Sequence, residues 1–264
     1  MSKLLHVMVA AVMLAGSDTN ASDPPLRQAQ IKRSGAVKTY TDFLQLPPGF
    51  SKRAYFELEM GPGSTGYSDA LLESKKVGDE VRYAYTHVMG LRFEDGTRAE
   101  ATITAELSTQ FVPYWAKTVR STIRPTGEVL DRTITATIQK DVVTITDSAA
   151  EPPGRREVPR GPAPYVMALD AALEFVDFEH HDKFLLYEFD PESGSSELLG
   201  FRSKKNKDGT WSIEAGVIKG LLRYLITIGA DGKLLRWQND QGVLVIKRCS
   251  KERMEACKAR ANMG

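Results

Sequence analysis

The stretch that decides the fold is Gly78 to Ser108, GDEVRYAYTHVMGLRFEDGTRAEATITAELS. Apolar or half-apolar side chains recur at every second residue on both sides of its centre, as expected of two half-buried β-strands. These side chains are Val81, Tyr83, Tyr85, Met89, Leu91 and Phe93, then Ala99, Ala101, Ile103, Ala105 and Leu107. Between the two runs lies Asp95-Gly96, a pair that tolerates the positive φ angles of a tight turn. The stretch therefore predicts one long β-hairpin.

The same alternation, broken by turn residues such as Asp208-Gly209 and Asp231-Gly232, continues along most of the chain. It predicts further strands at 53–60, 67–76, 115–124, 129–138, 142–146, 183–189, 197–204, 210–217, 221–229, 233–237 and 242–248. Many strands at such short spacing favour an antiparallel sheet that curls. We expect a mainly β fold, with a large antiparallel curved sheet that forms a half-barrel. A closed barrel is the alternative.

A proline-rich segment interrupts this sheet at 149–164 and favours a loop, because proline removes a ladder donor and fixes φ. Directly after it, apolar side chains recur at helical spacing, and Pro164 suits the first turn of a helix. These side chains are Val166, Leu169, Leu173 and Val176. We expect a crossover helix over 164–178 that covers one face of the sheet.

The remaining boundaries follow from composition. A lead-in over 22–64 precedes the β domain at 65–248, and it holds a strand and a short helix at Val37 to Leu46 that Pro47-Pro48 ends. Residues 249–264 are rich in helix-forming side chains and predict a short C-terminal helix.

Residues 1–21 have the layout of a secretory signal peptide. Lys3 precedes an apolar run from Leu4 to Ala15, and small and polar residues follow as far as Ser22. The run is too short to span a bilayer as a helix, which takes about 20 apolar residues. We therefore expect an exported protein, periplasmic or extracellular, without an integral membrane span.

The bulk charge does not indicate a partner. Thirty-five Lys and Arg side chains offset 34 Asp and Glu, which leaves a formal net charge of +1. No net field therefore attracts nucleic acid, and we expect none as a partner. The oligomeric state is left open.

Two cysteines, Cys249 and Cys257, would meet an oxidising compartment after export. On one regular helix their Cα atoms would lie about 12 Å apart, beyond the ~7 Å limit for a disulfide. Bridging therefore requires Cys249 to lie outside the helix. The bridged and the free state remain equal alternatives.

No cluster of residues has the pattern of a catalytic, metal or cofactor site. His180-His181-Asp182 would place its adjacent imidazoles on opposite faces of a strand and supplies few metal ligands. The glycines at 61–66 match neither a nucleophile elbow nor a phosphate-binding loop. We predict no catalytic residue, no metal and no cofactor.

Two apolar stripes are the candidate ligand-binding residues. The first strand of the hairpin presents Tyr83, Tyr85, Met89, Leu91 and Phe93, and the expected helix presents Leu169 and Leu173. The simpler expectation is that the two stripes pack against each other as core. The alternative is that the proline-rich segment lets the helix swing and expose an apolar groove for an acyl chain or a peptide.

The order of turns and elements resembles two groups of bacterial envelope proteins. It runs from Phe93-Glu94-Asp95-Gly96-Thr97 through Pro125-Thr126-Gly127-Glu128 and the 164–178 helix to 225–236. This order resembles the β-rich envelope region that precedes the transglutaminase-like core of some exported proteins. It is more distantly similar to curved-sheet periplasmic carriers of lipoproteins. The resemblance covers 65–248, and because no Cys, His and Asp constellation follows, it implies no transglutaminase or protease activity.

These observations predict an exported, non-enzymatic binding or interaction module whose partner is an apolar small molecule or an envelope protein. The alternative is a hydrolase, or an accessory subunit of a transglutaminase-like or peptidase system, whose site forms only in three dimensions. A polar-lined pocket with converging histidine and carboxylates would favour the alternative, whereas an apolar trough would favour the binding module.

The signal peptide gives the first testable prediction. The mature protein from its native host is expected to begin near Asp18 or Ser22, because small residues precede both positions. Mass spectrometry of the intact protein measures this start. Retention of residues 1–16 on a cytoplasmic or membrane-anchored form would contradict the export hypothesis.

Overall fold

The structure is a computed structural model that describes residues 38–39, 46–47, 49–139, 142–149, 154–159, 165–217 and 223–262. The expected signal peptide lies outside these residues, as does most of the lead-in before residue 46. Within the described part of the chain, no helix has the length and apolar character needed to cross a membrane.

The first half of the sheet is an antiparallel meander in which each strand pairs with the next along the chain. Its strands before residue 150 are the ones that the alternating pattern predicts, whereas the last strand lies in the segment that was expected to be a loop. They are β2 (Ser51–Met60), β3 (Thr65–Val77), β4 (Glu80–Arg92), β5 (Arg98–Leu107), β6 (Pro113–Ile123), β7 (Val129–Gln139), β8 (Val142–Asp147) and β9 (Gly154–Pro159).

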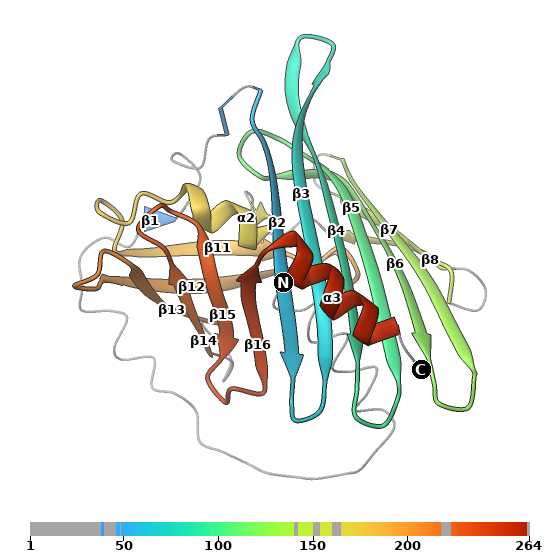
Figure 1. The fold of residues 1–264 in the computed structure, drawn as a ribbon. Helices are drawn as coiled ribbons and strands as arrows, with labels where there is room; N and C mark the ends of the chain where they lie inside the picture. Colours follow the sequence, from blue (N-terminus) through green and yellow to red (C-terminus); the bar gives the residue numbers. More distant parts are fainter. Residues whose placement is uncertain are drawn as a thin grey trace, which may run out of the picture.

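The second half is another antiparallel meander, and its last strand pairs with β2, so the two halves form one continuous sheet. It consists of β11 (Lys183–Phe189), β12 (Ser196–Lys205), β13 (Trp211–Val217), β14 (Arg223–Ile228), β15 (Leu234–Asn239) and β16 (Leu244–Cys249). The sheet curves strongly (Figure 1). The row of hydrogen-bonded strands ends at β9. Among the described residues, β9 pairs with no strand near the other end of the row, where β11 lies. The predicted mainly β, open curved sheet is confirmed.

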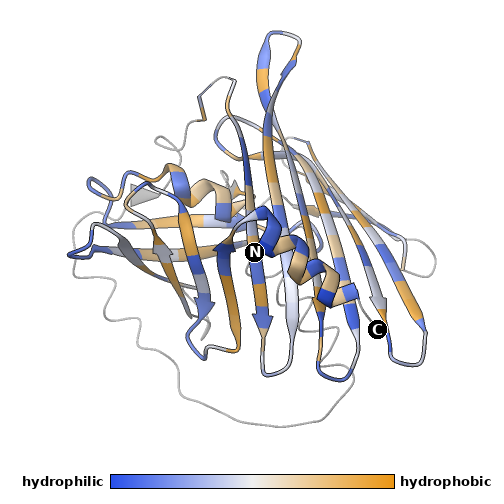
Figure 2. Ribbon diagram, viewed as in Figure 1, coloured by the Kyte–Doolittle hydropathy of each residue, from blue (hydrophilic) through white to orange (hydrophobic). Residues whose placement is uncertain are grey.

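The predicted central hairpin is β4 and β5, paired from Tyr83 opposite Leu107 to Arg92 opposite Arg98. The amide of Phe93 donates to the Thr97 carbonyl at 2.9 Å, and Gly96 has a φ of +85°. Alternate side chains of β4 are buried, and the apolar and polar bands along the strands follow this alternation (Figure 2). Period-2 burial and a positive-φ glycine therefore fix the hairpin as expected.

The expected helix at 164–178 is wrong in extent. It is reduced to α2 (Leu169–Ala172) and a 3₁₀ turn, η2 (Leu173–Phe175). A short strand precedes it, β10 (Tyr165–Val166), which pairs in parallel with β11. Ala168 has a φ of +60°, a left-handed conformation that stops the helix from extending toward the N-terminus.

Two further expectations need correction. Part of the proline-rich 149–164 segment is the edge strand β9, paired with β8, and Pro159 is its last residue, a place where a sheet accepts proline. In the lead-in, a helix was expected over 37–46. Lys38–Thr39 instead form β1, which pairs in parallel with β11, and residues 40–45 lie outside the described part.

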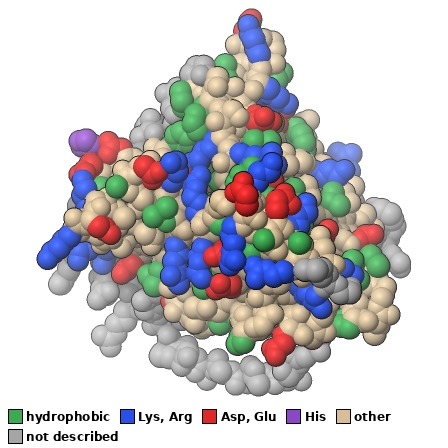
Figure 3. Space-filling model, viewed as in Figure 1, with side chains coloured by type: hydrophobic (Ala, Val, Ile, Leu, Met, Phe, Trp, Pro, Cys, Tyr) green, Lys and Arg blue, Asp and Glu red, His purple; other side chains and the backbone are tan. Residues whose placement is uncertain are grey.

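The predicted C-terminal helix is confirmed as α3 (Lys251–Asn262), which crosses the outer face of the sheet (Figure 1). Its buried residues Met254, Cys257 and Ala261 pack with Tyr67 of β3. A Cβ at Gly90 would lie 2.3 Å from the Tyr67 ring, so glycine is required for that ring to lie on β4. Lys and Arg side chains are interspersed with Asp and Glu over this face (Figure 3), as in a solvated surface.

The central turn gives a test of the fold. Replacing Gly96 with Val is expected to lower the free energy of unfolding by about 2 kcal/mol, because a β-branched residue is strained at positive φ. Val at Gly154 is the control, since that residue begins a β-strand, where β-branched side chains are accepted. Urea unfolding of both variants measures the difference. Equal losses of stability would show that the turn does not need this glycine.

Candidate functional site

The predicted ligand-binding residues all lie in the core. Tyr83, Tyr85, Met89, Leu91, Phe93, Leu169 and Leu173 belong to one hydrophobic cluster, and none is more than 9% exposed. The Tyr83 hydroxyl donates to the Pro47 carbonyl. The helix therefore packs on the inner face of the sheet, as in the simpler of the two expectations. A groove that opens when the helix moves stays a prediction.

Within this core runs a chain of hydrogen bonds that links β3, β4 and α2. The Oγ of Ser68 lies 2.6 Å from Nε2 of His87, and Nδ1 of His87 lies 3.0 Å from the Tyr85 hydroxyl. That hydroxyl donates to the Asp170 carboxylate, at 3.1 Å from Oδ1. All four side chains are buried. The sheet thus holds the short helix through one polar line across apolar surroundings.

The direction of each hydrogen bond in this line follows from its acceptor end. A carboxylate can only accept, so the single Tyr85 proton points to Asp170. Nδ1 of a neutral His87 then carries the proton and donates to the Tyr85 oxygen, and Nε2 accepts from the Ser68 hydroxyl. One tautomer of His87 satisfies the whole line.

Burial keeps the middle of this line uncharged. It lowers the pKa of His87, an effect that the nearby Asp170 carboxylate only partly opposes. The pKa of Tyr85 is raised well above its usual value, first by burial and then by Asp170. At neutral pH the sheet side of the line is therefore neutral.

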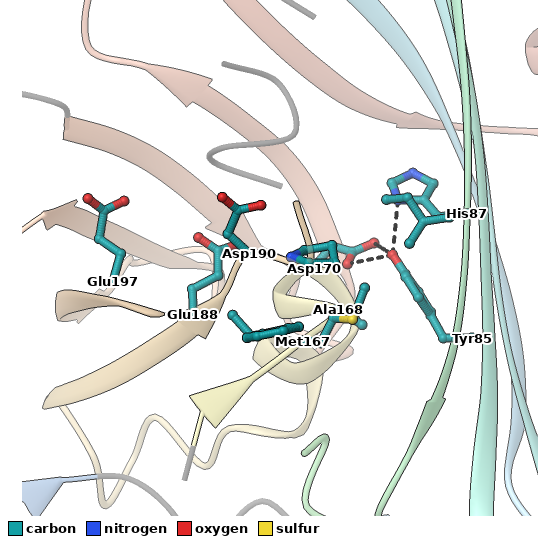
Figure 4. Close-up of a pocket in the computed structure, with 11 residues that line it drawn as sticks. Tyr85, His87, Met167, Ala168, Asp170, Glu188, Asp190 and Glu197 are labelled. Atoms are coloured by element: carbon teal, nitrogen blue, oxygen red, sulfur yellow. Dashed lines mark hydrogen bonds between the residues drawn. The ribbon is translucent and has the colours of Figure 1, made fainter. Parts of the chain in front are cut away.

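A small cavity opens beside this line, with a volume of about 40 Å³. It has room for about three water molecules. Its walls combine apolar side chains from β5, the link between β10 and α2, the end of β11 and the turn that follows with polar ones, and none of its lining residues is Lys or Arg. Figure 4 shows Glu188, Asp190 and Glu197 on one side, Tyr85 and His87 on the other, and Asp170 between them.

The cavity is acidic because of strand register. Glu188 of β11 lies directly opposite Glu197 of β12, an arrangement in which like charges repel. Glu188 is buried on the inward phase of its strand. The Asp190 carboxylate accepts from the Glu192 amide at 3.0 Å and from the Ser193 hydroxyl at 2.6 Å, which fixes it at the turn.

A second carboxylate, one helical turn after Asp170, also ties the helix to the sheet. Glu174 forms ion pairs with Lys52 of β2 and with Arg248 of β16, the latter at 3.0 Å. Burial lowers the pKa of Lys52 to about 8, with Arg248 as the next cause. Both polar attachments of the helix are thus buried and paired, as buried charge requires.

The turn that carries Asp190 is held against the far end of the sheet. Arg120 of β6 pairs with the Glu192 carboxylate, and Arg156 of β9 donates to the Glu192 carbonyl at 2.6 Å. Burial lowers the pKa of Arg120 to about 10, and Arg132 adds to the effect. These contacts position the carboxylate side of the cavity.

The other sequence candidates lie elsewhere. His180 is exposed, with Nδ1 2.6 Å from an Asp177 oxygen, and the described residues contain no group of three or more metal-binding side chains. Cys249 is the last residue of β16 and Cys257 lies in α3. Cys249 is therefore outside the helix, which is the position that a disulfide would require. Both thiols are free in the structure, and for an oxidising compartment the bridged and the free state stay equal alternatives.

Sequence reasoning missed His87 and Asp170, although both fall on buried phases. His87 lies midway between Tyr85 and Met89 in the period-2 pattern of β4. Asp170 follows Val166 by four residues and so shares the apolar stripe of the expected helix. A polar residue on each buried phase was the available signal, because such residues need a partner.

Comparison with known proteins assigns no family. No family model matches the chain, and no curated protein matches it in sequence. A similar solved structure is a β-barrel-like protein of a domain of unknown function, DUF1849, from Brucella abortus. The two are 10% identical with a TM-score of 0.49, over 76% of this chain and 96% of that one.

The polar line can be tested by removing its central hydroxyl. Tyr85→Phe is expected to lower the free energy of unfolding by about 2 kcal/mol, because it leaves the buried carboxylate and a histidine nitrogen without this partner. Tyr114→Phe, at an exposed ring on β6, is the control and should change little. Equal urea midpoints for the two variants would contradict a structural role for the line.

Proposed function

We propose that this chain is an exported, non-enzymatic binding protein that takes a small ligand with a positively charged group in the cavity beneath α2. The observation that carries the proposal is the composition of that cavity, which combines apolar walls with the carboxylates of Asp170, Glu188, Asp190 and Glu197 and lacks a lining cation. A concave apolar site with a few convergent polar groups is the usual form of a ligand pocket.

Charge supports a cationic ligand. Glu188 and Glu197 are direct neighbours on adjacent strands, so a positive group beside them would be attracted by both carboxylates. Met167, Phe189 and Ile103 also line the cavity and would pack against the apolar part of such a ligand. An acyl chain or a ligand carboxylate fits this lining poorly, because it would meet buried negative charge.

Size limits what enters the closed form. A cavity of about 40 Å³ holds a small ammonium group but not a drug-sized ligand. A larger ligand therefore requires α2 to move away from the sheet. The apolar groove that is the alternative in the sequence analysis would open by the same movement of α2. The two hypotheses therefore differ in the chemistry of the ligand and not in the movement of the helix.

A hydrolase is the second candidate, and the Ser68–His87–Tyr85–Asp170 line favours it, since a histidine hydrogen-bonded to a serine can act as its base. Ser68, however, is 1% exposed and does not line the cavity. A nucleophile must reach its substrate, so this geometry supports binding better than catalysis.

The ligand class can be measured directly. Native mass spectrometry and calorimetry with short primary alkylammonium ions, the corresponding alcohols and a fluorescent fatty acid should show saturable binding of the cations alone. Glu197→Gln is expected to weaken that binding by about tenfold, because it removes a charged contact. Glu214→Gln, at an exposed position on β13, is the matched control.

Three results would contradict the proposal. Equal binding of alcohols and ammonium ions would remove the role of charge, and uptake of the fatty acid alone would support the apolar groove instead. Labelling of Ser68 by a fluorophosphonate would support the hydrolase.

A further inference from the structure

We propose that the cavity beneath α2 is gated by a proton on His87, so that acidification releases α2 from the sheet and lowers ligand affinity. The gate rests on the proposed function for its purpose, since it regulates access to that ligand site. The release of α2 itself can be observed without any ligand.

The geometry places His87 where a gate would act. It lines the cavity, and through its Nδ1 it bonds to Tyr85, which is the residue that binds the helix at Asp170. Its other nitrogen is held by Ser68. The histidine thus lines the cavity and also bonds to the residue that holds α2. Its protonation state therefore affects both ligand binding and the attachment of α2.

The groups around His87 decide which state it prefers. On the sheet side its neighbours are Ser68 and Ala70 of β3, Tyr85 of β4 and Ile103 of β5, and none of these is charged. The more distant Asp69, on β3, forms an ion pair with Arg53. Facing it are the carboxylates of α2, β11, the following turn and β12, namely Asp170, Glu188, Asp190 and Glu197. Lys52 acts on Asp170 from β2.

Burial lowers the pKa of His87 and outweighs the opposing effects of the Asp170 and Asp69 carboxylates, so the closed form favours neutral His87. An opened form, with the imidazole in water, takes up a proton near the ordinary pKa of about 6.5. The closed form therefore has its full stability above pH 6.5, and it loses stability as pH falls from there toward the lowered pKa of the buried histidine. A bound cation and a protonated His87 repel each other, so ligand affinity falls over the same pH range.

Hydrogen exchange of the unliganded protein tests the gate. The amides of Ala171 and Ala172, both bonded to the Ala168 carbonyl, report on α2, and the amide of Met254 reports on α3. Between pH 7.5 and 5.5, protection factors of the α2 amides should fall by up to about tenfold per pH unit once pH passes below 6.5. Protection at Met254 should stay constant.

Two variants and one titration complete the test. His87→Gln, which cannot gain a proton, should make α2 protection independent of pH, whereas His181→Gln should behave as the parent chain. Loss of protection at α2 and α3 alike, or an unchanged pH response in His87→Gln, would overturn the gate. If His87→Gln does not fold, the His87 resonance of the parent chain decides, and a pKa at or above 6.5 would overturn the gate while a lower one supports it. Failure of ammonium binding with an intact α2 response would count against the proposed ligand alone.

Discussion

The attachment of α2 and η2 to the inner face of the curved sheet is the contact on which the rest of the structure depends. A curved sheet of this size must cover its concave face, and here a segment of four α-helical and three 3₁₀ residues does so. Apolar packing of Leu169 and Leu173 fills the centre. Asp170 and Glu174, one turn apart, then fix the segment to nearby strands of the sheet, Asp170 to β4 and Glu174 to β2 and β16. Because both carboxylates are buried and the Lys52 and Arg248 partners of Glu174 are partly buried, displacing the helix separates paired groups.

The same inner face also explains why the sheet can stay open in its hydrogen bonding. The turn after β11 reaches the inner face of β6 to β9, where Glu192 pairs with Arg120. Gly194 lies so close to Ile145 that a Cβ would be 2.6 Å from its Cδ1. Side chains thus join the two ends that no strand pairing joins among the described residues. The cavity is the space left between this turn and the helix, which is why its walls come from distant parts of the chain.

The sequence predicts local features well because their causes are local. The alternating side chains and Gly96 that determine the β4–β5 hairpin lie close together in the sequence. Most strand boundaries are also close to the expected ones. The helix was overestimated because the pairing of Tyr165–Val166 with β11 depends on residues far along the chain. The site shows the same limit, since the contact between Tyr85 and Asp170 spans 85 positions. The sequence shows that polar residues fall on buried phases, but it does not show that these residues come into contact.

The hydrogen-bonded line is closed at both ends, and this bears on what it can do. At one end the Ser68 hydroxyl gives its proton to His87 and does not line the cavity, and at the other end the Asp170 carboxylate accepts from Tyr85, so the hydroxyl nucleophile of the line does not face the cavity. A line without an accessible nucleophile contributes rigidity and specificity rather than chemistry. Its remaining variable is the number of protons that it holds, and histidine is the side chain whose ordinary pKa lies in the physiological range. A conformational role for the line therefore follows more directly from its geometry than a catalytic one.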